Sequence, residues 1–183
     1  MVATPVDLPH GGPVMAWVPP PMNCYKVNWE VYKDLATKMW TAGILIRDHG
    51  GHVLAAQCVH VHGHVLAAQC VHVQYHPRGV HPKFYACVHA LMFALEMSFA
   101  EIIVEGPTFQ PLETLKNRPS GPTIGDSWLE EIWVLIQKFR RCSLSSIPPE
   151  INKGAWMLAK FGSTIKESRI WIEEVPVMLQ DVL

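Results

Sequence analysis

Glu30 is the first candidate for chemistry in this 183-residue chain. It lies in the segment KVNWEVY, residues 26–32, where apolar and polar residues alternate as on a strand. A lone acid on a strand is usually solvated on the exposed face, so Glu30 by itself predicts no activity. The sequence has no P-loop, no glycine-rich dinucleotide motif and no Ser-His-Asp pattern. Any chemistry at Glu30 therefore depends on the rest of the chain.

A second candidate is a set of cysteine and histidine residues at alternate positions, which would share one face of a strand. The set comprises Cys58, His60, His62, His64, Cys70 and His72. Thiol and imidazole groups suit Zn²⁺ or copper. However, the Cys-x-His spacing is not that of an established zinc motif, and residues 51–61 recur letter for letter as residues 63–73. Duplication alone explains the pattern, so we predict no metal site there.

Lys138, Arg140 and Arg141 are the candidate nucleic-acid-binding residues. They end a predicted helix, where cations complement the negative end of the helix dipole, and they could also contact phosphate. The formal net charge of −1 gives the chain no overall attraction to nucleic acid. Any such contact must therefore be local.

Length and composition favour one folded domain. The chain is 49% hydrophobic and has seven tryptophans, enough for a sizeable core. We predict a proline-rich leader at residues 1–18 and a domain at residues 19–183, with an internal tandem duplication at 51–73. Five cysteines, an odd number, favour reduced thiols in the cytoplasm or nucleus. We see neither a secretory signal nor a membrane-spanning run, so we expect no contact with a membrane.

The elements that would position these residues alternate between strands and helices. Alternation, helical periodicity and capping signals such as Ser127 with Glu130 locate them. The predicted order is strands 25–32, 41–48 and 52–61, helix 83–96, strand 100–106, helix 127–141, strand 142–147, helix 148–162 and an amphipathic tail 170–183. This order predicts an α/β sandwich with a mixed sheet.

The second copy of the duplicated segment, residues 63–73, has two possible places. The repeat period of twelve is even, so a second copy that continued as a strand would keep the same side chains on the same face. The two copies could form an extra hairpin, whose exposed edge would be a candidate pairing surface. Alternatively, one copy could be extruded as a loop.

In this order, the segments resemble the plant ribonuclease H-like domain, found at the ends of retrotransposon reverse transcriptases and in stand-alone plant genes. The resemblance covers about residues 17–183. The family has a tryptophan and prolines before a Lys-x-Asn-x-Asp-Gly-Ala strand, a helix beginning Ala-Glu, a strand ending Glu-Gly-Asp-Ser, a final Asn-x-x-Ala-His-x-Leu-Ala-Lys helix and a Trp-x-Glu-x-x-Pro ending. The matching segments are WVPPPMNCYKVNWEVY, ACVHALMFALEM, VEGPTF, NKGAWMLAK and WIEEVP.

The resemblance implies a ribonuclease H-like fold, with a five-stranded mixed sheet and helices on both faces. It also implies an ancestral activity, cleavage of the RNA strand of an RNA–DNA hybrid by two Mg²⁺ ions held between carboxylates. Glu30 stands where the family has its first metal-binding aspartate and is the one catalytic carboxylate retained. The other three family positions carry Cys87, Pro107 and Trp156, none of which is a hard oxygen ligand for Mg²⁺.

We therefore expect a degenerate two-metal site without a cofactor, in a non-catalytic module that binds nucleic acid or protein. Its partner would be an RNA–DNA hybrid, a single-stranded nucleic acid or another protein. The alternative is an active or residual ribonuclease that uses Mg²⁺ with Glu30 and recruited acids, for which the candidates are Glu101, Glu105 and Asp126. A third hypothesis is a decaying copy with no selected activity, which the perfect repeat would also fit.

Overall fold

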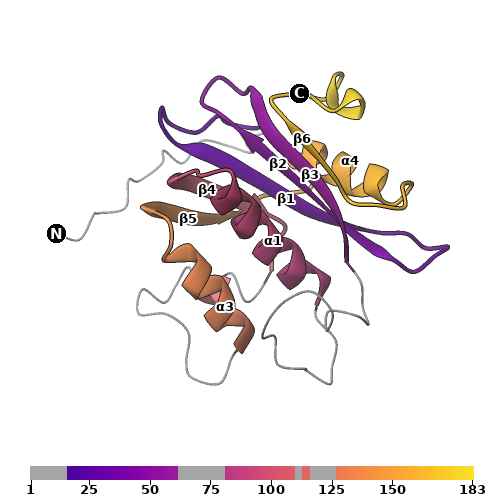
Figure 1. Ribbon diagram of the computed structural model, residues 1–183, viewed down its shortest axis with the longest axis horizontal. Helices are drawn as coiled ribbons and strands as arrows, with labels where there is room; N and C mark the ends of the chain where they lie inside the picture. The colour runs from indigo at the N-terminus through magenta and orange to yellow at the C-terminus, as the bar shows by residue number, and fades with distance from the viewer. Residues whose placement is uncertain (1–15, 62–80, 110–112, 116–126) are drawn as a thin grey trace.

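Three consecutive antiparallel strands form the centre of the fold. The computed structural model describes residues 16–61, 81–109, 113–115 and 127–183. In it the strands are β1 (Tyr25–Lys33), β2 (Trp40–Arg47) and β3 (Val53–Val61), as Figure 1 shows. In the turn between β2 and β3, a carboxylate oxygen of Asp48 accepts hydrogen bonds from the backbone N–H groups of Gly50 and His52, both at 2.9 Å. The predicted meander is confirmed.

Further strands extend the sheet on both sides of this centre. β4 (Glu101–Gly106) runs parallel to β1, and β5 (Arg141–Ser146) runs parallel to β4. β6 (Arg169–Ile172) pairs antiparallel with β3. The order in this 6-stranded sheet is β5-β4-β1-β2-β3-β6. The predicted α/β fold with a mixed sheet is confirmed, with one strand more than the resemblance implied.

The additional strand does not come from the duplicated segment. β6 overlaps the start of the tail 170–183, for which we predicted only amphipathic character. It pairs with β3, which contains most of the first copy of the repeat, and so covers the outer edge of that copy from Ala55 to Cys58. The second copy, residues 63–73, lies outside the described residues.

Helices cover both faces of the sheet (Figure 1). α1 (Pro82–Glu96) and α3 (Ser127–Ile136) pack over the larger hydrophobic core on one face. α4 (Lys153–Gly162) and the short 3-10 helix η1 (Val177–Leu179) lie on the other face, over a smaller core. None of the described helices is long and apolar enough to cross a membrane.

Alternation along β1 distributes its side chains between these two faces. Val27 and Trp29 are fully buried in the core beneath α1. Lys26, Asn28 and Glu30 therefore point to the face that α4 covers. All three polar residues are buried, each with less than a tenth of its surface exposed. The expectation of a solvated Glu30 is thus wrong, because α4 and its neighbours cover this face.

Two helices are shorter than the sequence predicts. α3 ends at Ile136 and not at residue 141, because Arg141 already pairs with Glu101 as the first residue of β5. α4 begins at Lys153 and not at residue 148, since the prolines at 148 and 149 precede it in a turn.

Gly43 in β2 allows α4 to lie directly on the sheet. A Cβ atom at this position would overlap backbone atoms of Ala155 and Ala159 in α4. Backbone atoms cannot rotate away, so only glycine permits this approach. Gly43 is also the direct partner of Glu30 in the pairing of β1 with β2. The contact therefore fixes the position of α4 beside Glu30.

Candidate functional site

Glu30 lies near the middle of β1 with 6% of its surface exposed. One carboxylate oxygen accepts a hydrogen bond from the backbone N–H of Val31 at 3.0 Å. The other accepts from the Nδ2 of Asn152 at 3.3 Å. Two neutral donors thus satisfy a carboxylate that forms no ion pair with any of the described residues.

Asn152 comes immediately before α4, at the position where an asparagine normally caps a helix. Its side chain makes no capping hydrogen bond. Instead, Nδ2 donates to the backbone carbonyl of Trp29 at 2.8 Å as well as to Glu30. The side-chain oxygen of Asn152 is buried without a hydrogen-bond partner in the part of the chain that the structure describes. Asn152 therefore serves to join α4 to β1 at the candidate site.

Burial raises the pKa of Glu30 above its ordinary value. The hydrogen bonds from Val31 and Asn152 and the positive charge of Lys83 act in the opposite direction, without reversing the shift. A carboxylate that coordinates a metal ion must be ionised, and burial at this position makes its ionisation less favourable than in water.

The other three positions of the expected metal site do not supply ligands. Cys87 is fully buried in α1, and burial raises the pKa of its thiol. Pro107 follows β4 and is also buried. Trp156 lies on α4 with 38% of its surface exposed. In residues 16–61, 81–109, 113–115 and 127–183, no three Asp, Glu, His or Cys side chains are grouped so that they could hold a metal ion. These residues therefore do not fit a pair of Mg²⁺ ions.

Trp156 forms an aromatic pair with Tyr32 beside Glu30. The two ring centroids are 5.9 Å apart and the planes meet edge-on at 82°. The ammonium group of Lys160, one turn further along α4, lies 5.1 Å from the centre of the Trp156 ring. Tyr32 stands where the family has the alanine of its first strand, and Trp156 stands at the lost ligand position. The sequence identifies both residues as departures from the family but does not predict that they contact each other. The four-residue spacing of Trp156 and Lys160 does indicate that these two side chains are neighbours on a helix.

Glu105, a candidate for a recruited catalytic acid, already interacts with other side chains. One of its carboxylate oxygens forms an ion pair with Lys26 at 2.8 Å. The other accepts a hydrogen bond from the side-chain amide of Asn28 at 3.0 Å. Both charged side chains are at least nine-tenths buried. Glu105 therefore belongs to a buried polar network next to Glu30 and does not turn toward it.

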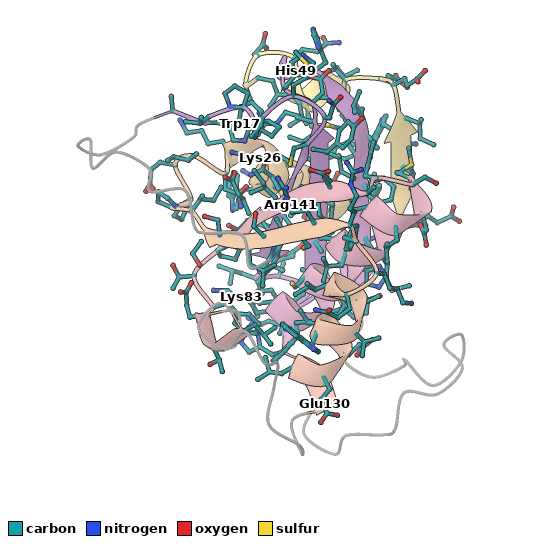
Figure 2. All side chains as sticks on the ribbon, turned by 90° about the vertical axis from the view of Figure 1, so that its left-hand side faces the viewer. Trp17, Lys26, His49, Lys83, Glu130 and Arg141 are labelled. Carbon is teal, nitrogen blue, oxygen red and sulfur yellow. The ribbon has the colours of Figure 1, made fainter. Side chains whose placement is uncertain are left out.

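Arg47 and Trp17 complete this network on the α4 face. The Arg47 guanidinium donates to the Asn28 side-chain oxygen at 3.0 Å, and the indole N–H of Trp17 donates to the same oxygen at 3.1 Å. The guanidinium carbon lies 3.5 Å from the centre of the Trp17 ring. Burial lowers the pKa of Arg47 to about 10, which leaves it charged at neutral pH. In Figure 2, Trp17 and Lys26 lie together, well away from Lys83.

Glu101, a second candidate acid, does not reach Glu30 either. Glu101 pairs with Arg140 and, at 3.8 Å, with Arg141. Asp126 lies outside the described residues. Because Tyr25 pairs with Ile102 at the start of β4, Glu101 lies at the end of the sheet where β1 begins.

Lys138, Arg140 and Arg141, the candidate nucleic-acid-binding residues, are exposed, yet they lie at a distance from Glu30. They follow the end of α3, and the two arginines share Glu101 as a partner. Tyr25 and Glu30 are five residue steps apart along β1, about 16 Å of extended chain. The structure therefore does not bring the basic residues and Glu30 into one site.

The cysteine and histidine pattern can be followed only in its first members. Cys58 is buried in β3, and burial raises the pKa of its thiol. The backbone N–H of His60 donates to the hydroxyl of Ser168 at 3.4 Å. The remaining four members, at positions 62, 64, 70 and 72, lie outside the described residues.

A protein-family model described as reverse transcriptase-like matches residues 36–162. Among solved structures, RNase H1 from the halophilic archaeon Halobacterium salinarum aligns with a TM-score of 0.57 and 15% identity, over 77% of this chain and 98% of that one. The N-terminal RNase H domain of a Mycobacterium tuberculosis protein aligns with a TM-score of 0.56 and 13% identity, over 77% and 94%.

LC11-RNase H1, solved in complex with an RNA/DNA hybrid, aligns with a TM-score of 0.54 and 13% identity, over 75% of this chain and 94% of that one. At these identities the likeness shows the fold alone. No curated protein matches the chain.

Proposed function

The chain belongs to the reverse transcriptase-like family of RNase H-like domains, and we propose that it keeps this fold to bind single-stranded nucleic acid without cutting it. The proposal is supported by the exposed aromatic ring of Trp156, which lies where the resemblance leads us to expect a metal ligand. Where the family has ligands for two metal ions, this chain has one buried carboxylate, Glu30, beside the exposed ring of Trp156.

We expect no cleavage for two reasons. Too few carboxylates lie at one point in the described part of the chain, and burial opposes the ionisation of Glu30. Hybrid hydrolysis by two metal ions needs several ionised carboxylates at one point. Among the described residues Glu30 is alone there, with a raised pKa and neutral hydrogen-bond donors on both oxygens. Glu105 and Glu101 are held by their own cationic partners. The site can accept hydrogen bonds but has no means to hold a divalent ion against water.

Binding to nucleic acid is supported by what replaces the ligands. Exposed tryptophan rings stack on unpaired bases, and nearby lysines attract the phosphate backbone. Trp156 has 38% of its surface exposed, and Lys160 lies beside the same ring. A second ring with an ammonium partner, Trp40 with Lys33 at 5.4 Å, lies at the same end of β1 but on the opposite face of the sheet, which α1 covers, and so is not part of this surface. One solved neighbour of the same fold, LC11-RNase H1, is described with an RNA/DNA hybrid.

Fluorescence anisotropy with labelled single-stranded RNA, single-stranded DNA and an RNA–DNA hybrid tests this proposal. Trp156→Ala removes the ring and should weaken single-strand binding by about five- to a hundred-fold, the usual loss for one stacked base. Trp156→Phe keeps an aromatic face and should retain most of the affinity. Lys160→Gln should weaken binding, and Lys166→Gln, an exposed lysine beyond α4, is the matched control for lost charge.

Equal binding by the wild type and Trp156→Ala would remove the stacking argument, and tighter binding to the hybrid would favour duplex recognition. No binding to any of the three would contradict the proposal and leave protein interaction as the function to pursue.

A cleavage assay separates the residual ribonuclease from the binding module. A labelled hybrid is incubated with Mg²⁺ and then with Mn²⁺, and the wild type is compared with Glu30→Ala. We expect no cleavage by either protein, with circular dichroism confirming that both are folded. Cleavage by the wild type that disappears in Glu30→Ala would overturn the proposal and restore the enzyme hypothesis.

A further inference from the structure

β6 forms one border of the sheet (Figure 1). It exposes apolar side chains there. Ile170 and Ile172 are 49% and 57% exposed, although both lie within a strand. Their partners on β3, Gln57 and Ala55, place them on the face that α1 covers further along the sheet. No described strand pairs with the outer edge of β6. An edge strand with exposed isoleucines favours pairing with a further strand.

The register with β3 decides which backbone groups of β6 face outward. The N–H of Glu173 donates to the carbonyl of Leu54 at 2.8 Å. In an antiparallel pair, alternate residues exchange hydrogen bonds with the neighbouring strand. The backbone groups of Trp171 therefore also point to β3, and those of Ile170 and Ile172 point away from it. The outward hydrogen-bonding positions are thus the two exposed isoleucines.

We propose that β6 pairs antiparallel with β6 of a second copy of this chain, across a two-fold axis at Trp171. Outward-facing groups must meet outward-facing groups, so Ile170 of one copy lies opposite Ile172 of the other. In this register, the outward backbone groups of Ile170 and Ile172 in both strands can form hydrogen bonds across the interface. A register centred on Ile170 or on Ile172 would use fewer of these groups. The two sheets then continue into one another with their α1 faces on the same side.

The side chains of this register are complementary as well. The sequence from Arg169 to Glu173 reads Arg-Ile-Trp-Ile-Glu, so a two-fold axis at its centre places Arg169 opposite Glu173 of the second copy. Both side chains are exposed. Isoleucine meets isoleucine on one face, while opposite charges flank the two Trp171 rings on the other. This self-complementarity indicates a second copy as the partner, in preference to an unrelated peptide.

The length of the strand sets the strength of the expected dimer. β6 has 4 residues, and the exposed side chains of Val175 and Val177 follow it. An interface of this extent falls in the low range for specific association, so we expect a dimer with a dissociation constant of about 10 to 100 micromolar. The inference does not depend on the nucleic-acid site, because Trp156 lies on α4 and takes no part in it.

Sedimentation velocity with the full chain, over about 1 to 300 micromolar, tests the dimer. Arg169→Glu and Glu173→Arg each place like charges opposite one another and should weaken self-association about ten- to thirty-fold. In a mixture of these two variants, a chain of one can pair with a chain of the other, which restores opposite charges at both ends of the strand pair. The mixture should therefore associate about as well as the wild type. The double variant Arg169→Glu/Glu173→Arg should also dimerise.

Three results would overturn the proposal. They are a wild type that stays monomeric throughout the concentration range, single variants that dimerise as well as the wild type, and a mixture no better associated than its separate components. Thermal unfolding of each variant, measured alongside, shows whether the fold is retained. Ile172→Lys provides a second variant, which should abolish the dimer through the isoleucine contact.

Discussion

Glu30→Gln should make the protein more stable at neutral pH. The wild-type carboxylate is 6% exposed and has no cation in direct contact among the described residues. Burying such a charge costs several kcal/mol, and hydrogen bonds from Val31 and Asn152 offset most of that cost. Glutamine has nearly the same shape and carries no charge. We expect a gain of about 1 kcal/mol, or about 2 to 4 °C in the unfolding midpoint.

The gain should depend on pH in a defined direction. Because the pKa of Glu30 is raised in the folded state from its ordinary value of 4.5, the folded protein binds its proton more tightly than the unfolded chain does. The wild type therefore loses stability as pH rises from 4.5 through the folded pKa. Glutamine does not titrate, so the advantage of Glu30→Gln should be small below pH 4.5 and reach its full size at higher pH.

Glu105→Gln is the matched control, since it changes the same side chain on the same face of the sheet. Here the carboxylate is paired, and its loss leaves the ammonium group of Lys26 buried with the Val18 carbonyl and the face of the Trp17 ring but without a negatively charged partner. We expect a loss of about 3 kcal/mol, or about 6 to 12 °C. Thermal and urea unfolding followed by tryptophan fluorescence measure both variants. Destabilisation by Glu30→Gln comparable to that of Glu105→Gln would refute the reasoning.

Three further predictions concern the packing around the site, each measured by urea unfolding. Gly43→Ala should cost about 3 kcal/mol or more, because its Cβ would overlap the α4 backbone; retention of wild-type stability would show that α4 can shift. Trp17→Ala should lower the free energy of unfolding by about 2 kcal/mol, because it exposes Arg47. An effect near zero would show that Trp17 does not unfold together with the rest of the domain. Cys87→Glu, which restores the family's acid, should destabilise by about 3 kcal/mol or more through a buried unpaired charge, whereas an unchanged midpoint would mean that the position is open to water or to a cation.

The order of elements was predictable because each carries its own local signal. Alternation located β1, β2 and β3 to within about two residues, and apolar periodicity located α1. Helix ends were less well predicted, since the pairing of Arg141 with Glu101 in the sheet ends α3 early. The sequence of the tail 170–183 showed amphipathic character. The four residues that form β6 gave no local signal that they would pair with the edge of β3.

The contacts at the site were not predictable from local patterns. The side chain of Asn28 meets Glu105, 77 positions further along the chain, only because β1 and β4 pair in one particular register. Asn152 reaches Glu30 across 122 positions because Gly43 lets α4 approach. The resemblance singled out Glu30, Cys87, Pro107 and Trp156 as the positions to compare, whereas the partners that surround them depend on packing between distant elements.

The replacements around Glu30 also bear on the hypothesis of a decaying copy. Random loss at a metal site would leave buried polar groups unmatched, because nothing would select their partners. Here Cys87 is fully buried in the core, Tyr32 packs on Trp156, and Asn152 donates to Glu30 in place of capping its helix. The two replacements among these, Cys87 and Tyr32, pack against neighbours that suit them, whereas Asn152, which the family also has, keeps its side-chain oxygen buried without a hydrogen-bond partner among the described residues. The packing of the two replacements favours a stable repacked fold over random decay. A repacked site with an exposed tryptophan agrees with the binding module that we propose.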